Sequence, residues 1–561
     1  MEYGLAYNAG AASFEEGEKK SFFDSVYMQY LHLFFPSQID YLSKNCELVE
    51  ISTKLNFQKS IKLGYFECKI KNQAALLVRE NCLNKFEDLI RKNPHHKIFL
   101  CKNAEFFEIL EKEKKKNILY LSRYLQRFFN PRANAYILKE LASRIKVFFI
   151  PLLIIFISLY SGMLMYFANA VYFVQTIFKL VIFRSSLRYK CNDSREPLHY
   201  SELPIYTILI PLYREAAKVK KLLASIDKLN YPKNKLDVKL ILEFDDTQTY
   251  KAIKLLDMPS YVHVIRVPDA PPKTKPKACN YAMQFATGEL LVIYDAEDTP
   301  DPEQLLKAVA KYKSLDSSYA CLQARLKIEH NMFDILGFLF ALEYEMWFSY
   351  LLKGMSLSDL PIPLGGTSNH FKVSALKEMG LWDPYNVTED ADMGIRLNLQ
   401  GYKIDMLDSY TLEEPPISTH SWMKQRVRWI KGFMITFFLY ILHDKGKQLF
   451  MEKSAILVFV GFSVLSFLIC PIIVVNGIFS TKGSLIVFFS EMNLLLFLVF
   501  FWSVAYLLIK TSAVKHNFFN VIIIILFPIY FILHSFAAYF AILELLCKPF
   551  RWNKTDHQIL N

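Results

Sequence analysis

Four long runs of apolar residues divide the chain of 561 residues into two kinds of segment. The runs cover 147–183, 455–478, 485–509 and 519–546. Each is longer than the ~20 apolar residues that a helix needs to cross the hydrocarbon layer of a bilayer. Soluble helices are rarely so long and so poor in charge. The pattern therefore predicts membrane-spanning helices, with about three spans over 454–548.

The run at 147–183 is too long for one span and barely long enough for two. Basic residues flank it on both sides, at Arg123, Arg127, Arg132, Lys139, Arg144, Lys146, Arg184, Arg188 and Lys190. Positive charge marks the cytoplasmic side of a membrane, so both ends of the run are expected there. We therefore expect a two-span hairpin over 147–186 that turns near Gly162–Asn169. A single span would place the middle of the chain outside.

Between 190 and 432, short apolar runs alternate with helical patterns. The runs are IYTILIP, DVKLILEF, VHVIRV, ELLVIYD and YACLQARL. This β–α alternation predicts an α/β domain with a mostly parallel sheet and helices on both faces.

In the soluble arm at 1–146, the order of strand and helix patterns predicts a small α+β domain. Strands are expected at QAALLVRE and KIFLCKN, and a helix around Phe86–Arg91. A second helix should end in the charge run EKEKKK at 111–116, which we expect to be a solvated helix end.

Composition bears on partners and compartment. The chain is 53% hydrophobic with a net charge of +12, and its cations cluster beside the apolar runs. Anionic lipid headgroups are therefore expected partners, and nucleic acid is not. The nine cysteines have no paired spacing, which predicts reduced thiols. The beginning of the chain is polar and includes EEGEKK, so no cleavable signal peptide is predicted.

Acidic residues follow two of the predicted strands. LILEFDDTQT ends in Asp245 and Asp246, and LLVIYDAEDTPDP ends in Asp295, Glu297 and Asp298. Such residues also cap helices, and for a single cluster that is the better explanation. Two clusters at strand ends, where α/β sheets bind ligands, favour a site for Mg²⁺ or Mn²⁺. The sequence lacks the glycine-rich loops of P-loop ATPases and of nicotinamide enzymes.

Two further motifs carry chemistry. In VTEDADMGIRL, acids such as Glu389 and Asp390 open a predicted helix, where they either complement its dipole or supply a general base. In QRVRW, Gln425, Arg428 and Trp429 share one helix face. Arg428 suits a diphosphate and Trp429 a sugar ring. Taken alone, however, the motif is explained slightly better by a basic interfacial helix with an aromatic anchor. An interfacial helix is expected over 433–453, and a short tail over 549–561.

These motifs, in this order, resemble the processive family 2 glycosyltransferases, the class of cellulose, curdlan and hyaluronan synthases. The resemblance covers about 205–555 and rests on EFDD, DAE, TED and QRVRW. It also includes ILIPLYRE, KPKACNYAM, GGTSNHF and KPFRWNKTDH. The soluble arm loosely resembles the small N-terminal domain of type II secretion ATPases and of some bacterial glycosyltransferases. The implied catalytic fold is a GT-A-like, Rossmann-like domain facing the cytosol.

The resemblance also implies roles for single residues. The nucleotide-sugar would be bound by Asp245 or Asp246, Lys277 and Asp295. Asp295 and Glu297 would hold Mg²⁺ or Mn²⁺, and Asp390 would be the catalytic base. The acceptor and the diphosphate would be bound by Glu389, Gln425, Arg428 and Trp429. Two departures from the family pattern stand out: Glu297 replaces an aspartate, and LEFDD replaces the usual D-D-G.

The expected function is that of a multi-pass enzyme of the plasma (inner) membrane. It would use a nucleotide-sugar, UDP-glucose first among them, to extend a β-linked polysaccharide with inversion. If the product is exported, accessory export proteins are a further class of partner. The alternatives are a non-processive transferase that adds one or a few sugars to a lipid, and an inactive scaffold or transporter.

Overall fold

The computed structural model describes two compact units, residues 1–118 and 119–561. Within them it describes residues 39–41, 49–51, 63, 65–70, 73–79, 96–101, 103–129, 134–136, 161–187, 198–329, 334–441, 454–479, 484–511 and 518–548.

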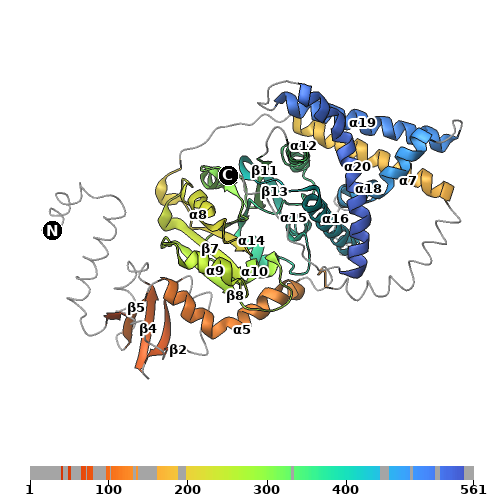
Figure 1. Ribbon diagram of the computed structural model, residues 1–561. Coiled ribbons are helices and arrows are strands. Elements are labelled where there is room, and N and C mark those ends of the chain that lie inside the picture. Colours follow the sequence, from red (N-terminus) through yellow and green to blue (C-terminus); the bar gives the residue numbers. More distant parts are fainter. Residues whose placement is uncertain are drawn as a thin grey trace. The chain divides into compact units, whose positions relative to one another are not determined.

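The first unit contains a five-stranded sheet in the order β1-β5-β4-β3-β2 (Figure 1). The strands are β1 (Ile39–Tyr41), β2 (Val49–Ile51), β3 (Tyr65–Ile70), β4 (Gln73–Arg79) and β5 (Lys97–Cys101). Strands β4 and β5 confirm the two strands predicted in the arm. The helix expected around Phe86–Arg91 lies outside the described residues.

Helix α5 runs from Asn103 to Phe129, so the charge run at 111–116 lies inside it. The expectation that the helix ends there is wrong. Lysine and glutamate are good helix formers, and apolar residues resume at Ile118, which is buried. The charge run therefore interrupts the apolar face without breaking the helix.

The second unit contains an eight-stranded sheet in the order β10-β13-β11-β12-β9-β6-β7-β8. Its strands are β6 (Tyr206–Leu212), β7 (Leu236–Glu243), β8 (Val262–Val267), β9 (Leu290–Ile293), β10 (Thr299–Pro300), β11 (Tyr319–Ile328), β12 (Asn369–Lys372) and β13 (Lys403–Glu413). The pairings of β9, β6, β7 and β8 are parallel, as is that of β11 with β13. Strand β12 is antiparallel to both β9 and β11, and β10 is antiparallel to β13. The sheet confirms the predicted α/β class, and the antiparallel β12 makes it mixed.

Six helices of the α/β domain pack around this sheet. They are α8 (Val219–Asp227), α9 (Thr247–Lys254), α10 (Lys275–Ala282), α11 (Gln304–Ser314), α14 (Val373–Glu378) and α15 (Glu389–Leu399). Two of them, α10 and α15, begin at the candidate site. Strand β7 pairs on both sides with parallel strands and is buried along its whole length, as expected for a non-edge strand covered on both faces.

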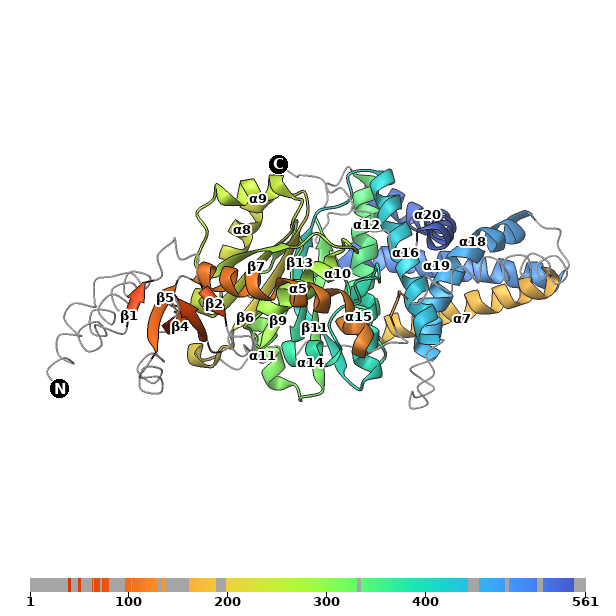
Figure 2. The same cartoon turned by 90° about the horizontal axis from the view of Figure 1, so that it is seen from below.

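The eight-stranded sheet lies at one end of the second unit, and apolar helices form the opposite end (Figures 1 and 2). They are α7 (Ser161–Leu187), α18 (Phe462–Phe479), α19 (Leu485–Thr511) and α20 (Phe518–Cys547). Helix α16 (Thr419–Ile441) packs against α20 and joins this layer to the sheet domain. A fifth apolar segment combines α12 (Ile335–Glu345), a π-helical turn (Met346–Leu351) and α13 (Leu352–Leu357).

Five segments are long and apolar enough to cross a membrane, among the described residues. They are Met163–Leu187, Ile335–Leu357, Ser454–Phe479, Leu485–Ile509 and Val521–Cys547. Three of them lie in the region for which about three spans are expected. The chain is thus a membrane protein, and its sequence pattern did not reveal the segment inside the α/β block. That segment packs against α7, where a Cβ on Gly354 would stand 2.2 Å from the carbonyl oxygen of Ile182.

The turn expected near Gly162–Asn169 is wrong, because α7 passes through these residues as one continuous helix. Asn169 suggested a turn, but its side chain is buried and serves helix packing. Its amide donates to Met165 O at 2.9 Å, and it accepts a 2.8 Å hydrogen bond from Asn493 of α19. Residues 147–160 lie outside the described ranges, so the hairpin itself stays a prediction.

The helix expected over 433–453 is described only in part. Residues 433–441 continue α16 without a break, and residues 442–453 lie outside the described ranges. The tail expected at 549–561 also lies outside them.

Candidate active site

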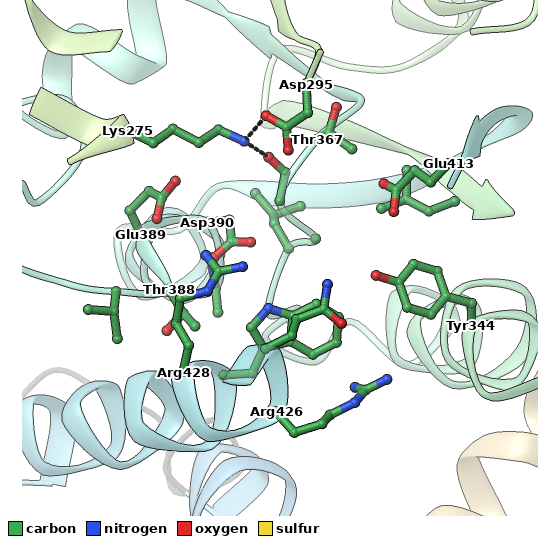
Figure 3. Close-up of a pocket in the computed structure, with 18 of the residues that line it drawn as sticks. Lys275, Asp295, Tyr344, Thr367, Thr388, Glu389, Asp390, Glu413, Arg426 and Arg428 are labelled. Atoms are coloured by element: carbon green, nitrogen blue, oxygen red, sulfur yellow. Dashed lines mark hydrogen bonds and ion pairs between the residues drawn. The ribbon is translucent and has the colours of Figure 1, made fainter. Parts of the chain in front are cut away.

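A cavity of about 510 Å³ lies where the sheet domain meets the apolar helices. Polar residues line it on the side of the sheet domain, at Lys275, Asp295, Glu297, Glu389, Asp390, Glu413, Gln425 and Arg428. The rest of the lining combines aromatic residues with polar ones, at Tyr344, Trp347, Trp429, Phe433, Phe467 and Phe531 and at Lys179, Glu343, Arg426, Ser463 and His534. Figure 3 shows the polar side chains converging from different elements.

The loop after β9 places Asp295 in this cavity. The ammonium group of Lys275 donates to Asp295 Oδ1 at 2.5 Å and to Gly366 O at 2.7 Å (Figure 3). Asp298 shapes the same loop, because its Oδ2 accepts the Asp295 N–H at 2.8 Å and the hydroxyl of Thr367. Asp298 therefore holds the loop, while Asp295 faces the open space.

Sequence reasoning selected Lys277, but of the two lysines in KPKACNYAM it is Lys275 that lines the cavity. Lys277 is fully buried and forms a 2.7 Å ion pair with Glu243, which itself lines the cavity. The two lysines lie two positions apart at the start of α10 and so point in different directions. Only the local orientation of the helix distinguishes them.

The structure separates Asp245 from Asp246. Asp246 is buried and caps α9: its Oδ1 accepts the Thr249 N–H at 3.1 Å and its Oδ2 the Arg214 N–H at 2.5 Å. It does not line the cavity, so the capping explanation describes it well. Asp245 is partly exposed and pairs at 2.9 Å with Lys273, which does line the cavity.

Glu413, at the end of β13, joins Asp295 and Glu297 in the cavity lining. Burial and the nearby carboxylates of Asp298, Asp295 and Glu297 raise the pKa of Glu413 well above its usual range. Sequence reasoning missed this residue, because a strand that continues into TLEEPP has no metal-ligand spacing. Glu297 lies 3.6 Å from the ammonium group of Lys218.

The carboxylates present fit a cation that is shared with a substrate. The described residues contain no cluster of three or more His, Cys, Asp or Glu side chains that could hold a metal alone. Mg²⁺, however, commonly takes one or two carboxylates together with substrate phosphates. Asp295 and Glu297 supply two oxygen ligands in one cavity, and each now faces a lysine. This donor chemistry suits Mg²⁺ or Mn²⁺.

Helix α15 begins with Glu389 and Asp390, both of which line the cavity. Burial and the charge of Asp390 raise the pKa of Glu389 to about 8. Burial also raises the pKa of Asp390, while Lys275 and Arg428 oppose this shift. Burial therefore favours the protonated form of both carboxyl groups, and the positive charge of Lys275 opposes this at each of them.

Helix α16 presents Gln425, Arg428 and Trp429 to the cavity, as their spacing predicts. Gln425 is buried, and its Oε1 accepts no hydrogen bond from any residue that the structure describes. A Cβ on Gly432 would stand 2.2 Å from the hydroxyl of Thr388, so a glycine lets α16 approach the start of α15. The two motifs thus meet where the side chain of Thr388 packs against the backbone of Gly432.

A sequence profile described as Glycosyl transferase family group 2 matches residues 290–543. The matched segment contains DAE, TED and QRVRW but not EFDD. This match confirms, for that part of the chain, the enzyme class predicted from the motifs.

Three curated relatives are similar to less than half of this chain. A probable glycosyltransferase YdaM of Bacillus subtilis is 24% identical over 45% of this chain and 60% of its own length. A probable glycosyltransferase of Sulfolobus acidocaldarius is 26% identical over 46% and 55%. The poly-β-1,6-N-acetyl-D-glucosamine synthase of Staphylococcus aureus is 24% identical over 45% and 59%. The alignments thus span less than two thirds of the length of these relatives.

Two solved structures are also similar. The mannosyltransferase PcManGT of Pyrobaculum calidifontis, in complex with GDP-Man and Mn²⁺, has a TM-score of 0.46 at 17% identity, covering 68% of this chain and 99% of that one. Staphylococcus aureus TarS 1–349, in complex with UDP-GlcNAc, has a TM-score of 0.33 at 12% identity, covering 59% and 89%.

Proposed function

We propose that this chain is a membrane-embedded inverting glycosyltransferase that moves a sugar from a nucleotide-sugar to a growing β-linked glycan. One observation carries the proposal: Asp295, Asp390 and Trp429 line a single cavity although they come from three different elements. A strand-end acid, a helix-start carboxylate and an indole are the groups that bind a donor, deprotonate a hydroxyl and stack on a sugar.

In this proposal Asp390 accepts the proton of the attacking hydroxyl. The hydroxyl approaches the anomeric carbon from the face opposite the nucleotide, so an α-linked donor gives a β-linked product. The nucleoside diphosphate leaves as its bond to the anomeric carbon breaks. Arg428 offsets the charge that develops on it, because a guanidinium matches phosphate oxygens geometrically. A cation held by Asp295 and Glu297 would, when bound, supply further neutralisation of the diphosphate.

The acceptor sugar is proposed to stack on Trp429 and to bond with Gln425. The unsatisfied Oε1 of Gln425 supports this, because a buried acceptor without a partner costs stability unless a ligand satisfies it. Glu389 is protonated at neutral pH in this account and donates a hydrogen bond to the same acceptor.

The donor proposed is a UDP-sugar, and two should be tried first. UDP-glucose follows from the resemblance seen in the sequence. UDP-N-acetylglucosamine follows from the staphylococcal relative, whose name specifies a β-1,6-linked N-acetylglucosamine polymer. We further propose that the α/β domain faces the cytosol of a plasma membrane, where nucleotide-sugars are available.

A lipid acceptor is the second candidate, and the cavity walls favour it specifically. Trp347, Phe433, Phe467 and Phe531 supply apolar surface to the membrane-side part of the cavity, beside the polar side chains of Lys179, Ser463 and His534. Such a lining suits the first carbons of a lipid chain as well as the faces of sugar rings.

The experiment uses the purified full chain in detergent with Mn²⁺ and either UDP-sugar. UDP release together with long sugar chains supports the polymerase. A discrete product extractable into organic solvent supports transfer to a lipid. If the protein binds both UDP-sugars but releases UDP from neither, the choice of donors is overturned.

A further inference from the structure

A buried polar cluster joins three helices at the wall of the cavity. Glu343 of α12 accepts a 2.5 Å hydrogen bond from the guanidinium of Arg426 on α16. The same carboxylate accepts the hydroxyl of Tyr530, and its other oxygen lies 3.3 Å from Nε2 of His534, both on α20. All four side chains are buried. One carboxylate therefore connects the helix of the QRVRW motif to the last apolar helix.

The cluster contacts the indole of Trp429 through Arg426. The guanidinium carbon of Arg426 lies 4.4 Å from the ring centroid of Trp429, within cation–π range. The Tyr344 ring lies 6.1 Å from the same indole. The hydrogen bond from Arg426 to Glu343 fixes the plane of the guanidinium. The indole of Trp429 packs against that guanidinium.

A purely structural role for Glu343 is the alternative to be excluded. Buried ion pairs are weak evidence for stability, since apolar residues of similar volume often do as well. A second ion pair, Lys431 to Glu544 at 2.8 Å, already joins α16 to α20. Neither of its members lines the cavity, whereas Glu343, Arg426 and His534 do. The Glu343–Arg426 pair therefore lines the candidate site, whereas the Lys431–Glu544 pair does not.

We propose that Glu343 is a positioning residue for the acceptor. Glu343 orients Arg426, and Arg426 in turn supports the plane of the Trp429 indole. Because Tyr530 and His534 also bind Glu343, this support depends on the position of α20. The proposal rests on the proposed function, in which Trp429 stacks on the acceptor sugar. It extends that function by naming the group behind the indole.

The test compares Glu343→Gln with Glu544→Gln in the purified full chain. The first measurement is acrylamide quenching of Trp429 fluorescence, taken as the difference between each variant and the same variant carrying Trp429→Phe. The second is the KM for a glucose or N-acetylglucosamine oligosaccharide acceptor, beside the KM for the matching UDP-sugar. Tyr530→Phe, which removes only one hydroxyl, is measured in the same way.

In Glu343→Gln we expect several-fold greater quenching of Trp429. The acceptor KM should rise about tenfold, as when a supporting partner of a binding residue is removed, with the UDP-sugar KM little changed. Tyr530→Phe should give a smaller change in the same direction, and Glu544→Gln none. Equal quenching and acceptor KM in the Glu343 and Glu544 variants would overturn the proposal.

If Glu343→Gln does not fold, Tyr530→Phe decides. An unchanged acceptor KM and unchanged quenching in that variant would also overturn the proposal. If the unmodified chain transfers neither sugar, the proposed function fails for these donors. The quenching comparison still shows whether Glu343 holds the indole.

Discussion

The ammonium group of Lys275 lies 2.5 Å from Asp295 Oδ1, so this carboxylate already has a cationic partner. Lys275 is well buried and also bonds to Gly366 O. A divalent cation bound by Asp295 and Glu297 would therefore have to compete with a lysine that is already in place. In the absence of substrate phosphates this competition should keep metal affinity low.

Asp295→Ala should therefore weaken Mn²⁺ binding in the presence of UDP by about tenfold or more, because one of two carboxylate ligands is lost. Lys275→Met should instead strengthen Mn²⁺ binding in the absence of UDP. Both are measured by the electron paramagnetic resonance signal of free Mn²⁺. Unchanged Mn²⁺ binding in Asp295→Ala would contradict the metal assignment.

The pH profile of sugar transfer should show an acid limb set by Asp390. Burial raises the pKa of Asp390 above its usual value, so the base loses its proton, and the rate rises, at a higher pH than for an exposed aspartate. Arg428 lowers this pKa, so Arg428→Gln should move the limb to still higher pH. The measurement is kcat/KM for the donor from about pH 4 to about pH 9. An acid limb at the same pH in both proteins would contradict the role given to Asp390.

Asp246→Ala should reduce stability while leaving nucleotide binding nearly unchanged. Losing an N-cap costs about 1 kcal/mol, and Asp246 also accepts the Arg214 N–H. Denaturation midpoints and UDP titrations measure the two effects separately. Asp245→Asn is the matched comparison, since its partner Lys273 lines the cavity. A large loss of UDP affinity in Asp246→Ala would restore the nucleotide-binding role expected from the sequence.

Asp383 should make thermal stability depend on pH. Burial and the charge of Asp392 raise the pKa of Asp383 to about 7, far above that of an aspartate in the unfolded chain. Between about pH 4 and pH 7 the folded chain thus holds a proton that the unfolded chain has lost, so stability falls as pH rises. In Asp383→Asn this contribution disappears. The Tm of the variant, relative to that of the unmodified chain, should therefore increase with pH through this window. A constant difference in Tm would contradict the assignment.

The sequence predicted the parts of this architecture that are periodic. Apolar runs located β6, β7, β8, β9 and β11 of the α/β sheet, but not β10, β12 and β13. The spacing of Gln425, Arg428 and Trp429 correctly placed them on one face of a helix. Periodicity cannot tell an amide that turns a chain from one that joins two helices, which is why Asn169 suggested a turn. The segment at 335–357 was missed because its hydrophobicity serves both the sheet domain and α7.

The sequence also did not predict residues whose role depends on the direction in which the fold points their side chains. Lys275 and Lys277 look equivalent in KPKACNYAM, yet one reaches the cavity and the other pairs with Glu243. Glu413 and Glu343 belong to no recognisable spacing, and only folding brings them to the same cavity. Asp246 follows a strand as a ligand residue would, but the start of α9 uses both of its oxygens.

The central claim is that a base on α15 and a donor site after β9 act together in one cavity. It is tested most directly by measuring UDP release and sugar incorporation with Asp390→Asn, beside the unmodified chain and with UDP binding as the control. The account predicts a fall in turnover of about 10² to 10⁴, with UDP affinity retained, because only the proton acceptor is lost. Turnover equal to that of the unmodified chain would contradict it.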